Sequence, residues 1–249
     1  MISIKDVNNI LEKYELGNRG KAVAIEILQY YQVDEKICIV ILIETILHVR
    51  YVMKLLSDKW ICVEEEEKRS EFSEILRVDG LPVPQKYKMK NRFIGCFRFS
   101  DVEFRVTIED YFGEDLKTIS FGNIKTLGRL LADMHTISIN HECHLQKGAT
   151  YCALFSGRVD IDRIWGANKN ILLEANLYKK VKAVHEMSIS KIKNMWTDLP
   201  VYAVHGDLGL LSNVTIYNNR YGIIDFNLSG DEVLLNDMLV TWYSSVYSF

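Results

Sequence analysis

The sequence lacks the features that direct a chain into or across a membrane. Its longest apolar stretch, 37–47, contains Glu44 and is much shorter than the roughly 20 residues that span a bilayer. From Lys5 onward the N-terminus mixes acidic and basic residues, so it does not have the order of a signal peptide. We therefore expect a cytoplasmic protein without a membrane partner.

Paired cysteines are also missing. The 5 cysteines are dispersed and none lies in a CxxC pair, which argues against a disulfide framework and a zinc ribbon. A group of metal-ligand residue types at His141, Cys143, His144 and Cys152 matches no zinc template in its spacing, and we interpret it as part of a loop. The cysteine pattern is typical of a reducing cytosol.

Excess positive charge is absent as well. The 30 Lys and Arg residues are balanced by 33 Asp and Glu residues, for a formal net charge of -3. Nucleic-acid binding favours clustered basic charge, so we expect small-molecule partners and no nucleic acid. No GxSxG, HExxH or Walker A motif occurs, which argues against the commonest hydrolases and P-loop NTPases. The oligomeric state stays open.

What the sequence does contain is a group of oxygen-bearing side chains near its C-terminus. The run His205-Gly206-Asp207 is followed by Asn213 and then by Asp225, which comes directly after two isoleucines. Phosphoryl transfer needs an acid side chain that orients the attacking hydroxyl, and oxygen ligands that hold Mg²⁺ against the phosphates. Asp207, Asn213 and Asp225 fit these three roles.

The pattern of apolar residues predicts an α+β fold. With 249 residues, 48% of them apolar, the chain can bury one large core or two modest ones. Strand-like runs dominate the first half and helical spacing dominates the second, and the five expected strands would form one antiparallel sheet that carries a charged helix. We expect helices at 4–16, 62–78, 126–137 and 171–196, and strands at 22–31, 37–47, 50–56, 93–99 and 102–108. Two short strands are also expected, one at 201–204 directly before His205 and one that ends directly before Asp225.

The segments around Asp207 and Asp225 resemble the HGDxxxxN and DF motifs of the aminoglycoside phosphotransferase and choline kinase family, which shares the protein kinase fold. Segment 108–116 is similar to the hinge of that family, and 127–135 is similar to its LGxLLAxxH helix. All four segments occur in the family's order. Within the last of them, His135 is expected to be a buried, hydrogen-bonded residue of the core.

The resemblance implies a two-lobed, protein-kinase-like chain. The N-lobe, at 1–110, would hold the five-stranded antiparallel sheet and one charged helix. The C-lobe, at 111–249, would be mainly helical and short at its C-terminus. Segment 236–238 resembles the family's aspartate turn, which follows the metal-binding strand.

The resemblance also assigns roles in the C-lobe. Asp207 is the catalytic base, His205 supports its loop structurally, and Asn213 and Asp225 bind Mg²⁺. Members of the family usually have four residues between the aspartate and the asparagine, whereas this chain has five. Either the loop bulges, or Ser212 stands at the asparagine position.

In the N-lobe, Lys54 would reach the phosphates of the nucleotide. Such a lysine is held by a carboxylate of the neighbouring helix, for which we expect Glu71, with Glu67 as second choice. The phosphate-binding loop should lie at 32–36, where kinases usually place glycines that let backbone amides approach the phosphates. This loop has none.

The base of the nucleotide would bind the backbone of the hinge at Glu109 and Tyr111, with Ile224 also part of the nucleotide site. The implied function is transfer of the terminal phosphate of ATP or GTP, with Mg²⁺, to a hydroxyl of an aminoglycoside or a similar amino-alcohol metabolite. In the aminoglycoside case this activity would confer antibiotic resistance. A protein kinase is disfavoured because the HRD arginine is missing.

The alternative is a catalytically weak or inactive kinase-like protein that binds a nucleotide or another ligand. It is favoured by the glycine-free loop, the extra residue before Asn213 and the short C-terminus. A polycationic acceptor would need carboxylates, although most of the available ones are expected to be solvated. The candidates on C-lobe loops are Glu114, Asp115, Asp160, Asp162, Asp231 and Glu232.

Overall fold

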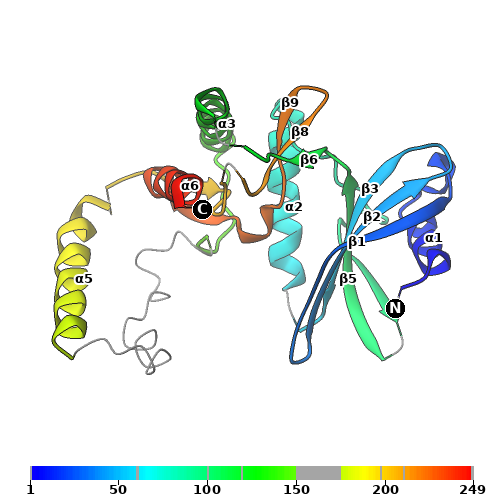
Figure 1. Ribbon diagram of the computed structural model, residues 1–249, viewed down its shortest axis with the longest axis horizontal. Coiled ribbons are helices and arrows are strands. Elements are labelled where there is room, and N and C mark those ends of the chain that lie inside the picture. The colour runs from blue at the N-terminus through cyan, green and yellow to red at the C-terminus, as the bar shows by residue number, and fades with distance from the viewer. Residues whose placement is uncertain are drawn as a thin grey trace.

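The computed structural model describes residues 2–59, 62–99, 101–118, 120–149, 175–196, 198–209 and 211–247. Four positions discussed above, Cys152, Asp160, Asp162 and the start of the expected helix at 171, lie outside the described residues. Within these ranges a strand-rich lobe and a mainly helical lobe lie on either side of helix α2 (Figure 1).

The strand-rich lobe is one five-stranded antiparallel sheet, as predicted, in the order β1-β2-β3-β5-β4. In β3 the side chains of Tyr51, Met53 and Leu55 are buried on one face, while Val52 and Lys54 alternate onto the other. This alternation directs Lys54 away from the lobe's own core. The strands are β1 (Ala22–Val33), β2 (Lys36–Thr45), β3 (Arg50–Ser57), β4 (Gly95–Phe99) and β5 (Val102–Asp110).

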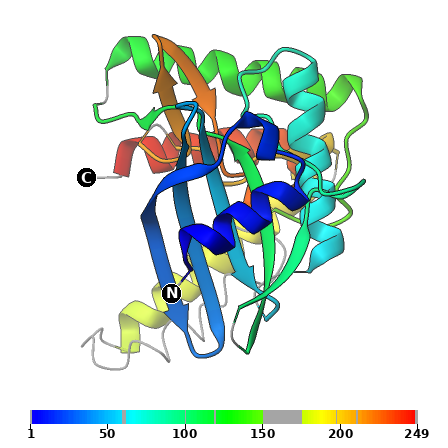
Figure 2. The same ribbon diagram turned by 90° about the vertical axis from the view of Figure 1, so that its right-hand side faces the viewer.

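Helix α1 (Ile4–Lys13) lies across the core side of this sheet (Figure 2). Its start is stabilised by a capping box, in which Ser3 and Asp6 each accept a backbone hydrogen bond from the other residue. The prediction that it extends to Leu16 is wrong. The helix ends at Lys13 because Glu15 takes a positive φ of 59°, which is incompatible with a right-handed helix.

Helix α2 (Val63–Val78) lies between the two lobes (Figure 1). Its apolar face belongs to the core of the C-lobe, where Phe72 and Leu76 pack with Leu131 and Phe226. The rings of Phe72 and Phe226 meet edge to face, with centroids 6.0 Å apart. The helix therefore comes before the hinge in sequence but shares its core with the residues after the hinge.

The second lobe contains more β-structure than the sequence predicted. The strand at 201–204 and the strand that ends directly before Asp225 were expected. The short strands at 114–115, 214–217 and 230–233 were not, because strands of two to four residues carry too few alternations to be recognised. No described helix has the length and apolar character that crossing a membrane requires. The elements are α3 (Phe121–Asn140), α5 (Ala175–Trp196), α6 (Leu234–Tyr247), β6 (Glu114–Asp115), β7 (Val201–Val204), β8 (Val214–Tyr217), β9 (Arg220–Ile223) and β10 (Gly230–Val233).

A buried His–Asp contact holds this lobe together. Nε2 of His135, on α3, lies 2.9 Å from Oδ2 of Asp237, on α6, and Oδ1 of Asp237 accepts a hydrogen bond of 3.0 Å from the backbone N–H of Gly206. Both side chains are buried. His135 is thus the hydrogen-bonded core residue that was expected, and Asp237 ties α3 and α6 to the start of the Asp207 loop.

We expect Asp237→Asn to lower the free energy of unfolding by about 2 kcal/mol, because it weakens buried hydrogen bonds to a charged group. Urea denaturation of the full chain measures this value. Asp133→Asn is the matched control, since Asp133 is exposed on α3, the helix that carries His135, and should change stability by less than about 0.5 kcal/mol. Equal effects of the two substitutions would contradict the bridging role of Asp237.

Candidate functional site

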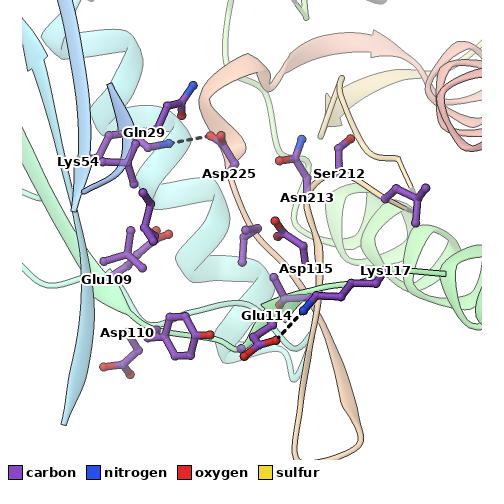
Figure 3. Close-up of a pocket in the computed structure, with 18 residues that line it drawn as sticks. Gln29, Lys54, Glu109, Asp110, Glu114, Asp115, Lys117, Ser212, Asn213 and Asp225 are labelled. Carbon is purple, nitrogen blue, oxygen red and sulfur yellow. Dashed lines mark hydrogen bonds and ion pairs between the residues drawn. The ribbon is translucent and has the colours of Figure 1, made fainter. Parts of the chain in front are cut away.

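A cleft of about 590 Å³ lies between the five-stranded sheet and the β8–β9 hairpin of the second lobe (Figure 3). Leu28, Val40 and Val52 from the sheet and Ile224 from the other side supply its apolar lining. The polar side chains of the lining are Gln29, Lys54, Glu109, Asp110, Tyr111, Glu114, Asp115, Lys117, Ser212, Asn213, Thr215 and Asp225.

An ion pair between the lobes stands at one end of the cleft. Nζ of Lys54, on β3, donates a hydrogen bond of 2.9 Å to Oδ1 of Asp225 (Figure 3). Burial disfavours the ammonium charge, but the Asp225 carboxylate raises the pKa of Lys54 above its ordinary value. Burial also disfavours the charge of Asp225, while Lys54 holds the pKa of Asp225 below its ordinary value. Both groups are therefore charged at neutral pH.

The backbone at Asp225 is unusual, with φ 63° and ψ 70° in the left-handed region. Residues with a β-carbon adopt this region at a cost, and aspartate and asparagine do so more readily than others. The conformation turns the chain sharply after β9, where the side chain of Asp225 also accepts a hydrogen bond of 3.4 Å from Asn227 N. As a result the carboxylate faces Lys54 across the cleft.

The extra residue before Asn213 is accommodated by a tight turn. Gly209 and Ser212 exchange backbone hydrogen bonds of 3.1 Å in both directions, and Asn213 takes a positive φ of 65°. The amide of Asn213 then donates to the backbone oxygen of Asp207 at 2.8 Å and to its Oδ2 at 3.3 Å. Of the two alternatives raised by the sequence, this geometry favours a bulged loop with Asn213 next to Asp207.

His205 connects the Asp207 loop to the strand before Asp225. Its Nε2 donates to the backbone oxygen of Ile224 at 2.9 Å, and its Nδ1 accepts from the backbone N–H of Asp207 at 3.3 Å. The ring is buried and packs against Phe226, with centroids 4.8 Å apart. Burial raises the pKa of Asp207 above its ordinary value. These contacts hold the His205 ring between the Asp207 loop and the strand before Asp225.

The carboxylate expected to hold Lys54 is not where the sequence placed it. Glu71 is exposed, and Glu67 accepts hydrogen bonds of 3.1 and 3.0 Å from the backbone N–H groups of 93–94. The acidic residue of α2 whose charge acts on Lys54 is the buried Glu66. Because four consecutive residues of α2 are glutamates, one of their carboxylates points inward whatever the rotation of the helix about its axis. Packing of the helix decides which glutamate this is.

Arg69 is a functional candidate that the sequence analysis missed. Its guanidinium lies 3.5 Å from the Glu66 carboxylate, and its Nε donates to the backbone oxygen of Ser229 at 3.0 Å. The Ser229 hydroxyl in turn donates to the backbone oxygen of His205 at 3.2 Å. Arg69 thereby couples α2 to both catalytic segments. The signal in the sequence that could have indicated Arg69 is the helical spacing of polar residues at 66, 69, 70 and 73, which are buried in the structure.

The backbone of the hinge at Tyr111 was expected to bind the base of the nucleotide, but it is already hydrogen-bonded within the protein. The backbone N–H of Tyr111 donates to the Arg50 oxygen at 3.1 Å, and its ring lies under the Arg50 guanidinium, 4.0 Å from ring centroid to Cζ. That N–H is therefore engaged, and Tyr111 contributes its side chain to the cleft lining. Gly113 has φ 101°, and a Cβ there would lie 2.3 Å from the Ile216 oxygen, so this position requires glycine.

The sheet covers the cleft with a bulge in place of a glycine loop. The β1–β2 register shifts between Ile27 and Gln29, which leaves Leu28 as an extra residue. Leu28 and Gln29 line the cleft, whereas the tip 32–36 does not. The expected phosphate loop at 32–36 therefore does not border this cleft, whereas the middle of β1 does.

The acidic candidates separate into two groups. Glu114 and Asp115 line the cleft, and Glu114 pairs with Lys117 at 3.3 Å (Figure 3). Asp231 instead accepts backbone hydrogen bonds of 2.7 and 2.8 Å from residues 145 and 146, and Glu232 is buried. Of the four candidates that the structure describes, only Glu114 and Asp115 are available to a ligand of this cleft.

Similar solved structures include small-molecule kinases. An amicoumacin kinase in complex with AMP-PNP and Ca²⁺ gives a TM-score of 0.62 at 12% identity, over 87% of this chain and 63% of that one. A microcompartment-associated aminopropanol kinase gives 0.61 at 15% identity, over 93% and 73%. A spectinomycin phosphotransferase with ADP and spectinomycin gives 0.59 at 14% identity, over 96% and 73%.

No protein-family model matches this sequence, and a search of curated proteins gives no match. This chain spans 63% of the length of the amicoumacin kinase. At these identities the likeness concerns the fold. The chain has the two-lobed, protein-kinase-like fold of the aminoglycoside phosphotransferases and related small-molecule kinases.

We expect Arg69→Met to lower the free energy of unfolding by about 3 kcal/mol, because it leaves the Glu66 carboxylate buried and unpaired. The double variant Glu66→Gln with Arg69→Met should recover part of this loss, since the buried charge is then removed. Arg77→Met is the control: it breaks the half-exposed pair with Glu74 on the same helix, which is worth less than about 1 kcal/mol. Purely additive effects of the Glu66 and Arg69 substitutions in a double-mutant cycle would refute the pairing.

Proposed function

We propose that this protein is a metal-dependent kinase that transfers the terminal phosphate of a purine nucleoside triphosphate to a hydroxyl of an amino sugar or amino alcohol. One observation carries this proposal. Lys54 and Asp225 are 171 positions apart in sequence, yet they meet in the cleft that Asn213 also lines, and the Asn213 amide contacts the carboxylate of Asp207. A cation, two oxygen ligands and a base are the groups that phosphoryl transfer needs.

Asp207 is the proposed catalytic base. Two contacts orient it: the Asn213 amide donates to its backbone oxygen and its carboxylate, and its N–H donates to His205. With its loop held in this way, the carboxylate can accept a hydrogen bond from an acceptor hydroxyl and align the hydroxyl oxygen with the transferred phosphorus. Because the raised pKa of Asp207 results from burial, its basicity toward that proton is increased.

The donor set of the site suits Mg²⁺. Asp225 offers carboxylate oxygens, and the Asn213 side chain, which donates through its nitrogen to Asp207, keeps its amide oxygen available. Mg²⁺ is commonly held by one or two protein oxygens plus phosphates and water, so these two residues are sufficient. When bound, the ion would neutralise negative charge on the phosphates. Lys54 would supply a further positive charge at the same place.

The acceptor would enter beside Glu114 and Asp115, which line the cleft as acidic groups. Carboxylates at this place favour an acceptor with a protonated amine. The names of the similar structures include aminopropanol and spectinomycin as compounds of those kinases. We place the activity in the cytoplasm, and if the acceptor is an aminoglycoside the protein would confer resistance to it.

A second candidate, a kinase-like protein that binds nucleotide without turnover, is favoured by the β1 bulge. Leu28 and Gln29 stand where glycines would let backbone amides surround the phosphates. The two candidates agree on nucleotide binding and differ in phosphate transfer to an acceptor.

We expect Asp207→Asn to reduce kcat by about 10²- to 10⁴-fold, because it removes the base and leaves the side chain's shape almost unchanged. The measurement is nucleoside diphosphate release with Mg²⁺ and a panel of amino sugars and amino alcohols. Nucleotide affinity should change little, and Asp133→Asn serves as an inert control. If Asp207→Asn keeps the wild-type kcat, Asp207 is not the base. If wild type binds nucleotide but phosphorylates no acceptor, the second candidate gains support.

Alanine at each of two neighbouring positions tests the metal site. Asn213→Ala should weaken Mg²⁺-dependent nucleotide binding at least about tenfold, because a hydrogen-bonded ligand is lost. Ser212→Ala should have no such effect, since Ser212 forms the turn through its backbone. Isothermal titration calorimetry with and without Mg²⁺ measures both. The reverse result would assign the family's asparagine position to Ser212.

A further inference from the structure

Glu109 places a carboxylate on the inner wall of the cleft. It lies on β5, on the sheet side between Lys54 and Asp110 (Figure 3), and it pairs with Val52 of β3 in the sheet register. Its side chain lines both the main cleft and a small cavity behind it. The backbone role expected at the hinge makes no use of this carboxylate.

The hydrogen-bonding capacity of this carboxylate is unused in the part of the chain that the structure describes. Two lysines face it electrostatically, but the Nζ of Lys54 donates to Asp225 and the Nζ of Lys86 donates to the Ser70 hydroxyl at 3.2 Å. Burial raises the pKa of Glu109 above its ordinary value, and the two lysines act in the opposite direction. Neither lysine donates a hydrogen bond to the two carboxylate oxygens, which have no donor among the described residues. A half-buried carboxylate in this state is stabilised by any ligand that brings N–H groups to it.

Apolar side chains line the cleft that Glu109 also lines, and we call the space between them the slot. Val40 and Val52 from the sheet and Ile224 from the opposite side line the same cleft. Lys54 and Asp225 occupy the phosphate end of that cleft, so a nucleotide bound there would place its base in the slot. The edge of the base would then face the Glu109 carboxylate.

We propose that the Glu109 carboxylate selects guanosine nucleotides over adenosine nucleotides; this rests on the proposed function of the cleft. Guanine presents two adjacent donors, N1–H and the 2-amino group, which match the two oxygens of a carboxylate. Adenine presents a donor, the 6-amino group, beside the N1 acceptor, whose lone pair a carboxylate repels. Sites that satisfy a polar edge in this way reject analogues that lack it far more strongly than apolar pockets do.

The same residue has a second conceivable role, as an electrostatic partner that only positions Lys54. In that case removal of the charge would weaken all nucleotides alike. Base selection instead changes the ratio between nucleotides. The ratio of dissociation constants is thus the measurement that separates the two roles.

The test is calorimetric titration of the full-length protein with GDP, IDP and ADP in the presence of Mg²⁺. Inosine keeps N1–H but lacks the 2-amino group, so the expected order of affinity is GDP, then IDP, then ADP, with at least about tenfold between GDP and ADP. This series uses wild-type protein and does not depend on any variant being folded. Equal affinities for GDP and ADP would overturn the proposal.

Glu109→Gln provides the second arm. Glutamine has one acceptor and one donor, which match the 6-amino group and N1 of adenine, so the GDP-to-ADP preference should fall at least about tenfold and can reverse. Glu26→Gln is the matched control: it makes the same substitution at an exposed position of β1 outside the cleft, and should leave the ratio unchanged. An unaltered ratio in Glu109→Gln overturns the proposal even if wild type prefers GDP. If no purine nucleotide binds, the proposed function itself fails, and this inference fails with it.

Discussion

The contact on which the site depends is the ion pair between Lys54 and Asp225. It joins β3 of the sheet to the turn after β9, at a distance of 2.9 Å, and it gives the cleft a charged end. Each of the two side chains is oriented by a different feature of the local backbone. Strand alternation turns Lys54 away from the lobe's core, and a left-handed backbone at Asp225 turns its carboxylate toward the lysine. The ion pair forms only when both backbone features are present.

Helix α2 keeps the two lobes in the relation that this contact needs. Its apolar face packs with Phe226, one residue after Asp225, and its Arg69 holds Ser229 three residues later. Through Ser229 and His205 the same network reaches the Asp207 loop. Buried polar networks of this kind specify one arrangement, because each unsatisfied member would cost several kcal/mol of hydrogen-bond and desolvation energy. The position of Asp207 relative to Asp225 therefore follows from packing at α2.

The predicted site residues that the structure brings together were those carried by short local patterns. Asp207 and Asn213 lie in one loop, and their contact survives an inserted residue because Gly209 and Ser212 close it into a turn. Two expectations about the site differed from the structure because they depended on tertiary contacts. Glu71 was chosen from a helix whose glutamates are nearly equivalent in sequence, and the phosphate loop was placed at a hairpin tip although the strand bulges earlier, at Leu28. In both cases contacts with distant residues decided the outcome.

The sequence by itself determined the α+β character, the order of the strands along the chain and the residue types available for the proposed catalytic roles. These follow from periodicity and from residue types within a few positions of each other, which local interactions control. Only the tertiary structure decided which glutamate of α2 faces Lys54, that Asn213 stays beside Asp207, and that the Glu109 carboxylate enters the cleft. Each of these depends on the rotation of a helix or the register of a strand against partners far away in sequence, and that choice is made by burial and hydrogen bonding in the packed molecule.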